Sequence, residues 1–65
     1  MKNFGKRLTK LRKDKGLSLE KLAKELNFTE ITLMFWEKGK MVLTISKIIK
    51  IAKYFDVSVD YLLGL

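Results

Sequence analysis

Apolar residues recur at helical spacing along most of the chain. Phe4, Leu8 and Leu11 lie three or four positions apart, with lysines and arginines between them, so they fall on one face of a helix. The same spacing returns further along the chain at Ile45, Ile48, Ile51, Ala52 and Phe55. No segment alternates with period two for long enough to indicate a strand. The pattern predicts an all-α chain.

Residues that start or stop helices divide the chain into five helical segments. The first is predicted from about Asn3 to Lys15, with Gly16 as its stop, and the second from the N-cap Ser18 to about Leu26, with Asn27 as its stop. The third is predicted between Thr29 and Gly39, the fourth after Thr44, and a short fifth, VDYLLG, after Ser58. After glycine, asparagine is the residue that most often ends a helix in the left-handed conformation, and Asn27 can therefore end the second segment.

The second and third segments are joined by only Asn27 and Phe28. So short a link forces a sharp crossing angle, as in a helix-turn-helix. Ala23 supplies the small residue that the crossing requires. Leu22, Leu33 and Trp36 supply apolar contacts to the core. These residues predict a helix-turn-helix at the centre of the chain.

The chain resembles the helix-turn-helix domains of the Cro and phage-repressor type, also called the xenobiotic-response-element family. The matching stretches are FGKRLTKLRKDKGLS (4–18), EKLAKEL (20–26), WEKGK (36–40) and IIKIAKYFDVSVDYLLGL (48–65). The resemblance implies a compact five-helix bundle of the lambda-repressor-like type, spanning residues 1–65 as a single domain. It also implies an ion pair between Arg12 and Glu37, and a third helix that enters the major groove of DNA.

In that family, the positions of Leu19, Glu30, Ile31, Thr32, Met34 and Phe35 face DNA. Members usually carry glutamine at the position of Leu19 and polar or basic residues at most of the other five positions. A helical wheel with Leu33 at zero places Ile31 near 160° and Phe35 near 200°, both approximate. These apolar residues therefore lie opposite the core side, where a surface helix is ordinarily polar.

We interpret this apolar face first as a protein-binding surface, since large exposed apolar patches mark interaction sites. Its residues would be Leu19, Ile31, Met34, Phe35, Met41, Val42 and Leu43. The partner would be another protein, or a second copy in a homodimer. The positions at which the chain departs from the family pattern are confined to one face. This also suggests an engineered or designed variant of the scaffold.

The alternative is a repressor-type transcriptional regulator that binds double-stranded DNA as a dimer on a two-fold operator. The chain carries 14 Lys and Arg against 7 Asp and Glu, for a net charge of +7, which favours a polyanionic partner. The DNA-binding residues would be Glu30, Thr32, Lys38, Lys40 and Lys47. For the lysines, phosphate contact and simple solvation fit equally well.

Composition argues against most other functions. The chain has no Cys and no His, so it lacks the usual general base and the commonest metal ligands. We expect no enzyme, no catalytic residue, no metal, no cofactor and no small-molecule substrate. The apolar runs are too short to span a bilayer, so we expect no membrane partner and, for a natural protein, a cytoplasmic location.

Overall fold

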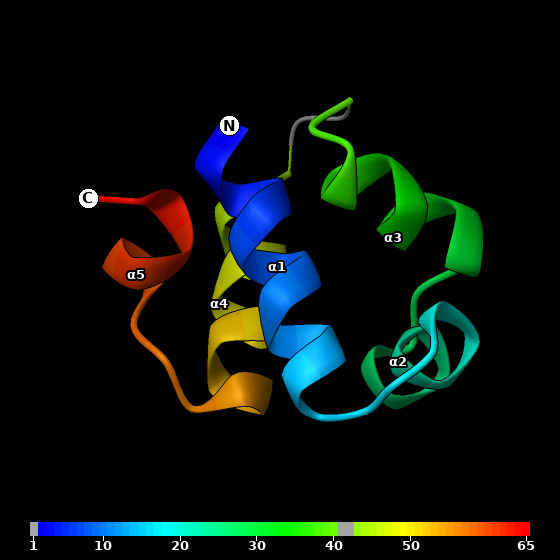
Figure 1. Ribbon diagram of the computed structural model, residues 1–65. Helices are drawn as coiled ribbons and strands as arrows, with labels where there is room; N and C mark the ends of the chain where they lie inside the picture. Colours follow the sequence, from blue (N-terminus) through cyan, green and yellow to red (C-terminus); the bar gives the residue numbers. More distant parts are fainter. Residues whose placement is uncertain (1, 41–42) are drawn as a thin grey trace.

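The computed structural model describes residues 2–40 and 43–65, and these form five helices with no strand (Figure 1). The helices are α1 (Lys2–Asp14), α2 (Leu19–Leu26), α3 (Glu30–Glu37), α4 (Ile45–Phe55) and α5 (Val59–Leu63). The all-α fold class and the number of helices predicted from the sequence are confirmed.

Side chains begin three of the helices as predicted. The hydroxyls of Ser18, Thr29 and Ser58 each accept a hydrogen bond from the backbone N–H three residues further on, which satisfies one of the free N–H groups of the first turn. Asn27 ends α2 in the left-handed conformation, with φ 60°. The turn that follows α2 therefore forms as the sequence predicted.

Both ends of α4 have features that the sequence did not predict. Thr44 precedes α4 with extended backbone, but its hydroxyl bonds the Ser46 hydroxyl (3.2 Å) and caps no backbone N–H. Asp56 ends α4 in the left-handed conformation, with φ 55°, and its N–H meets the carbonyl of Lys53 at 3.2 Å. Aspartate tolerates this conformation better than most residues because its short polar side chain bonds locally.

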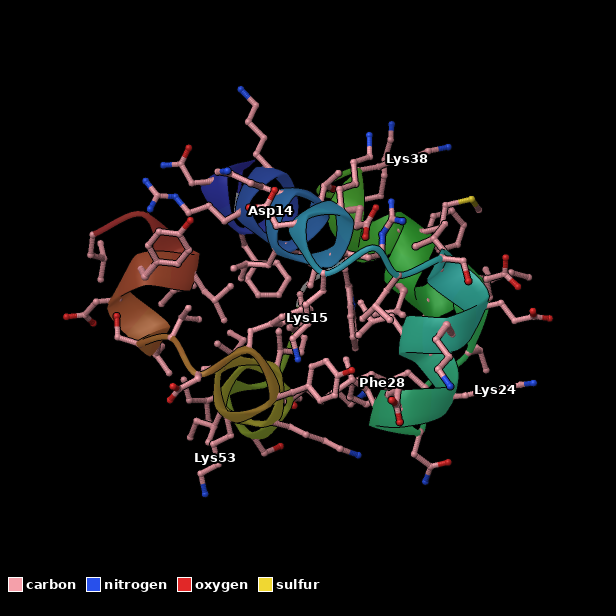
Figure 2. The ribbon with its side chains drawn as sticks, turned by 60° about the horizontal axis from the view of Figure 1, so that its bottom comes forward. Asp14, Lys15, Lys24, Phe28, Lys38 and Lys53 are labelled. Atoms are coloured by element: carbon pink, nitrogen blue, oxygen red, sulfur yellow. The ribbon has the colours of Figure 1, made fainter. Side chains whose placement is uncertain are left out.

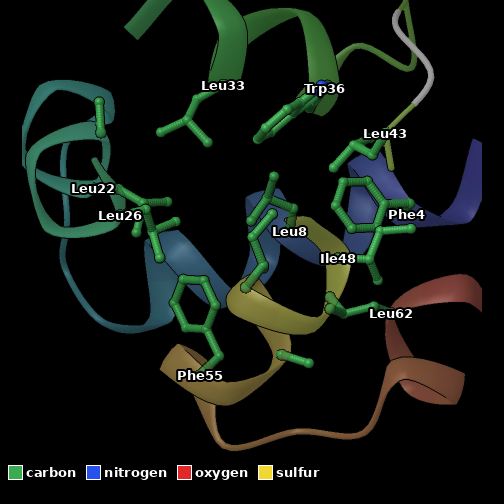
Figure 3. Close-up of a cluster of buried hydrophobic side chains, with 13 residues drawn as sticks. Phe4, Leu8, Leu22, Leu26, Leu33, Trp36, Leu43, Ile48, Phe55 and Leu62 are labelled. Atoms are coloured by element: carbon green, nitrogen blue, oxygen red, sulfur yellow. The ribbon is translucent and has the colours of Figure 1, made fainter. Parts of the chain in front are cut away.

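All five helices contribute to one apolar core (Figure 3). Its buried members are Phe4, Leu8, Leu22, Ala23, Leu26, Leu33, Trp36, Leu43, Ile48, Ile51, Ala52, Phe55 and Leu62. Within this arrangement α1 contacts both α3 and α5, α2 contacts α3 and α4, and α4 contacts α5. The core thereby fixes α3 from one side only, which leaves its other side at the surface.

Gly5 lets α1 approach the end of α3 closely. A Cβ atom at this position would lie 2.5 Å from the Glu37 carbonyl oxygen and 2.7 Å from that of Trp36. Both are backbone atoms of α3 and cannot rotate away. The absence of a side chain at position 5 therefore sets how near the two helices lie.

We expect Gly5→Ala to lower the free energy of unfolding by about 1–3 kcal/mol, the usual cost of overpacking. At an uncrowded helix position, alanine would instead raise the stability of the fold by about 1 kcal/mol relative to glycine. We expect the clash with α3 to outweigh this gain, so that the variant is less stable. Denaturant unfolding of Gly5→Ala, with the exposed neighbour Lys6→Ala as control, measures the effect. A more stable Gly5→Ala variant would show that α1 and α3 lie further apart.

Candidate nucleic-acid interface

The turn between α2 and α3 has the geometry of a helix-turn-helix. Residues 27–29 separate the two helices. The Phe28 N–H donates to the Ala23 carbonyl at 2.9 Å and the Asn27 N–H to the Lys24 carbonyl at 3.3 Å. Ala23 is buried, and its small side chain allows the helices to cross closely. The turn therefore holds α3 at a fixed angle to α2.

Three contacts hold the inner side of α3. Leu33 and Trp36 are buried in the core, and Trp36 meets Phe28 edge-on with ring centroids 4.9 Å apart. At the end of α3, Glu37 accepts from Arg12 through both carboxylate oxygens, at 2.7 Å from Nε and 3.1 Å from Nη2. This confirms the predicted ion pair, and it ties α3 to α1.

The outer side of α3 is apolar at its most exposed positions. Ile31 is 62% exposed and Phe35 39% exposed, while Met34 is half-buried. Glu30 is exposed in the first turn. Thr32 is half-buried, and its hydroxyl accepts a hydrogen bond of 2.7 Å from the Thr29 hydroxyl. This side of α3 thus offers an apolar surface with a carboxylate at one end.

Within the described residues, fewer side chains of the predicted apolar patch are exposed than the sequence predicted. Leu43, expected in it, is 7% exposed and belongs to the core, so its assignment to an exposed patch is wrong. Leu19 is half-buried and packs against the core. Met41 and Val42 were also assigned to the patch and lie outside the described residues. Among the described residues of this predicted patch, the exposed side chains are Ile31 and Phe35, and Met34 on the same helix is half-buried.

Exposed apolar side chains also occur elsewhere among the described residues. Ile45 is 60% exposed and Ile49 39% exposed on α4, and Leu65 is 88% exposed. Apolar exposure is therefore not confined to α3. This removes the main reason for treating the α3 face as a deliberately redesigned surface.

Lysines surround the helix-turn-helix. Lys38 and Lys40 are exposed just beyond α3, and Lys47 is exposed on α4 with its Nζ 5.9 Å from the centre of the Trp36 ring. Figure 2 shows Lys24 and Lys38 projecting from the α2–α3 side of the molecule, with Lys53 on the α4 side. The positive charge at the end of α3 suits a phosphate backbone.

Sequence reasoning missed one lysine beside the turn. Lys50 places its Nζ 4.9 Å from the ring centre of Phe28, and Phe28 lies in the α2–α3 turn. Lys50 follows Lys47 by three positions, so helical spacing places both on the same side of α4. That spacing was the signal that could have added Lys50 to the candidate residues.

Within the described residues, no group of three or more His, Cys, Asp or Glu side chains is placed to hold a metal ion. None of the helices described there is long and apolar enough to cross a membrane.

This fold, with one helix fixed at a sharp turn and presented at a basic surface, defines a helix-turn-helix protein. The helix-turn-helix family profile matches residues 8–62. The chain belongs to the helix-turn-helix family of the Cro and phage-repressor type. The family and the fold are those of non-enzymatic DNA-binding proteins.

A solved structure and two curated proteins are similar to the chain. The restriction-modification controller protein C.AhdI from Aeromonas hydrophila superposes with a TM-score of 0.83 at 33% identity, over 94% of this chain and 92% of that one. The transcriptional activator BcrR of Enterococcus faecalis is 35% identical over 61 residues, which are 94% of this chain and 30% of BcrR. The uncharacterised transcriptional regulator YobD of Bacillus subtilis (strain 168) is 35% identical over 62 residues, or 95% of this chain and 55% of YobD. The chain thus spans about a third and about half of the two curated relatives.

These comparisons overturn the first functional interpretation. The protein-binding module, with a protein or a second copy on the outer side of α3, is wrong as the main function: the family match and the regulators among the relatives indicate DNA binding. An engineered origin is not supported either. The apolar residue types on α3 favour a protein partner, but the match of the whole scaffold indicates DNA.

Proposed function

We propose that residues 1–65 act as the DNA-binding domain of a transcriptional regulator, which inserts α3 into the major groove of a specific operator. The observation that carries this proposal is the one-sided fixation of α3. Leu33, Trp36 and Glu37 bind its inner side to the core and to α1, while its outer side stays open. A rigid helix presented in this way suits the width of the major groove.

The charges of the chain support the same function. A net charge of +7 attracts DNA and speeds association. Lys38 and Lys40 are exposed just beyond α3, where they can contact phosphates of the DNA backbone. The relatives named as regulators of transcription add to this support. We propose a cytoplasmic location because the relatives are regulators from bacteria, in which DNA lies in the cytoplasm.

Selection from a random duplex library at moderate salt tests sequence-specific binding. We expect a defined motif to be enriched. If two copies bind together, its half-sites lie about 10 base pairs apart. Salt-sensitive recovery without an enriched motif would contradict the proposal, because phosphate contacts alone bind DNA without regard to sequence.

The lysines beyond α3 give a quantitative prediction. We expect Lys38→Ala plus Lys40→Ala to weaken binding to every duplex and to reduce the slope of log K against log salt concentration by about 0.9 for each lost phosphate contact. Titration of a labelled duplex between about 50 and 200 mM salt measures this slope. Lys53→Ala is the control, since Lys53 lies on α4 away from α3 (Figure 2). Equal slopes for the two variants would show that Lys38 and Lys40 do not contact phosphates.

A further inference from the structure

Only Glu30 and Thr32 on the outer side of α3 can read bases through hydrogen bonds, and the Thr32 hydroxyl already accepts one from Thr29. The sequence of α3 is EITLMFWE, without the Arg, Lys, Asn or Gln that form bidentate bonds with base edges. Of its two carboxylates, that of Glu37 is occupied by Arg12. The other, on Glu30, can only accept hydrogen bonds. The major-groove edge of guanine presents only acceptors, so Glu30 cannot bind it.

One base offers an apolar group in the major groove. Thymine carries a C5-methyl group there, and apolar side chains read it by contact. Ile31 and Phe35 are the most exposed apolar side chains of α3, at 62% and 39%. They therefore have free apolar surface that contact with methyl groups would remove from water.

The spacing of the two side chains matches that of bases two steps apart along one strand. Ile31 and Phe35 are four positions apart, so they lie on the same side of the helix. The rise between them is about 6 Å. Two base steps along one strand cover about 6.8 Å. An α3 that follows the groove can therefore place one side chain at each of two methyl groups.

We propose that Ile31 and Phe35 read thymine methyl groups, so that α3 selects its operator by thymines at one or two positions. This inference rests on the proposed function. DNA is the occupant that fits this apolar side because Lys38 and Lys40, just beyond α3, are both exposed and their charges favour a polyanion beside the helix. A duplex supplies the phosphates and the methyl groups together.

Replacing single thymines by deoxyuridine in the selected duplex tests the inference, because it removes only the methyl group. We expect each contacted thymine to weaken binding about fourfold when it is replaced, the fold-change that corresponds to one buried methylene-sized group. Fluorescence titration at fixed salt gives the affinities. The protein itself is unchanged in this part of the experiment, so folding does not affect the comparison.

Protein variants assign the methyl contacts to residues. In Ile31→Ala or Phe35→Ala, the thymine-to-uracil ratio of affinities at the matching position should fall towards one. Ile45→Ala is the matched control, because Ile45 on α4 is as exposed as Ile31, at 60% against 62%. In Ile45→Ala, the thymine-to-uracil ratio of affinities should stay about fourfold. Circular dichroism confirms that each variant is folded.

The outcomes separate the inference from the proposed function. A defined motif whose thymines all tolerate uracil would overturn methyl reading and leave sequence-specific binding intact. A uracil effect that persists in both α3 variants would overturn the assignment to Ile31 and Phe35. A library selection without any enriched motif would overturn the proposed function, and the inference with it.

Discussion

Replacing Trp36 by alanine is expected to lower the free energy of unfolding by about 3–5 kcal/mol. Trp36 is 1% exposed and contacts Phe28 edge-on in the α2–α3 turn. Its removal leaves a cavity between α3 and the rest of the core. Small domains are stable by as little as about 5 kcal/mol, so the variant should be largely unfolded at ordinary temperature. Urea denaturation measures the loss.

The neighbouring residue supplies the control for this prediction. Phe35 is also a large aromatic but is 39% exposed on the outer side of α3, so Phe35→Ala should cost about 1 kcal/mol or less. The comparison tests the rotation of α3 about its axis, on which the DNA-reading side depends. Equal losses for the two variants would mean that Phe35 belongs to the core and that α3 presents a different side.

Replacing Arg12 by alanine is expected to cost about 3–5 kcal/mol as well, because it leaves the Glu37 carboxylate without its partner in a largely buried site. The side chains of Arg12 and Glu37 are only 13% and 10% exposed. Arg12 also donates to the Leu17 carbonyl at 2.9 Å, a bond that the variant loses too. Thermal unfolding of the variant measures the combined effect.

Two controls separate the charge from the packing in this second prediction. Asp14→Ala breaks the Lys10–Asp14 pair, whose side chains are 66% and 61% exposed, and should cost about 0.5 kcal/mol or less. Arg12→Met plus Glu37→Leu removes both charges and should recover most of the stability. An Arg12→Ala variant as stable as Asp14→Ala would show that the pair is solvated and contributes little.

Local sequence signals were sufficient to predict most of the fold. The hydroxyls at positions 18, 29 and 58 cap helices as predicted, since a cap depends on a few neighbouring residues. Thr44 lacks the expected cap because its hydroxyl bonds Ser46 instead. Asp56 ends α4 without the glycine or asparagine that marks most such ends. Chemically similar residues compete at these positions, and sequence alone does not decide between them.

The site was harder to predict than the fold. Helical spacing correctly placed Ile31 and Phe35 on the exposed side of α3, because one face of a helix follows from its period. Helical spacing could not predict which way the side chain of Leu43 points, because Leu43 lies outside any helix. That side chain is buried in the core. The apolar residue types on α3 then led to a protein partner, whereas the scaffold as a whole indicates DNA. Contact with thymine methyl groups is how an apolar helix can serve that function.

The most direct test of the central claim is to locate α3 in a complex with the selected duplex by nuclear magnetic resonance. We predict intermolecular contacts between the side-chain protons of Ile31 and Phe35 and base protons in the major groove, with the largest amide shifts in α3. Contacts confined to α4 and α5, with α3 unchanged by DNA, would contradict the account.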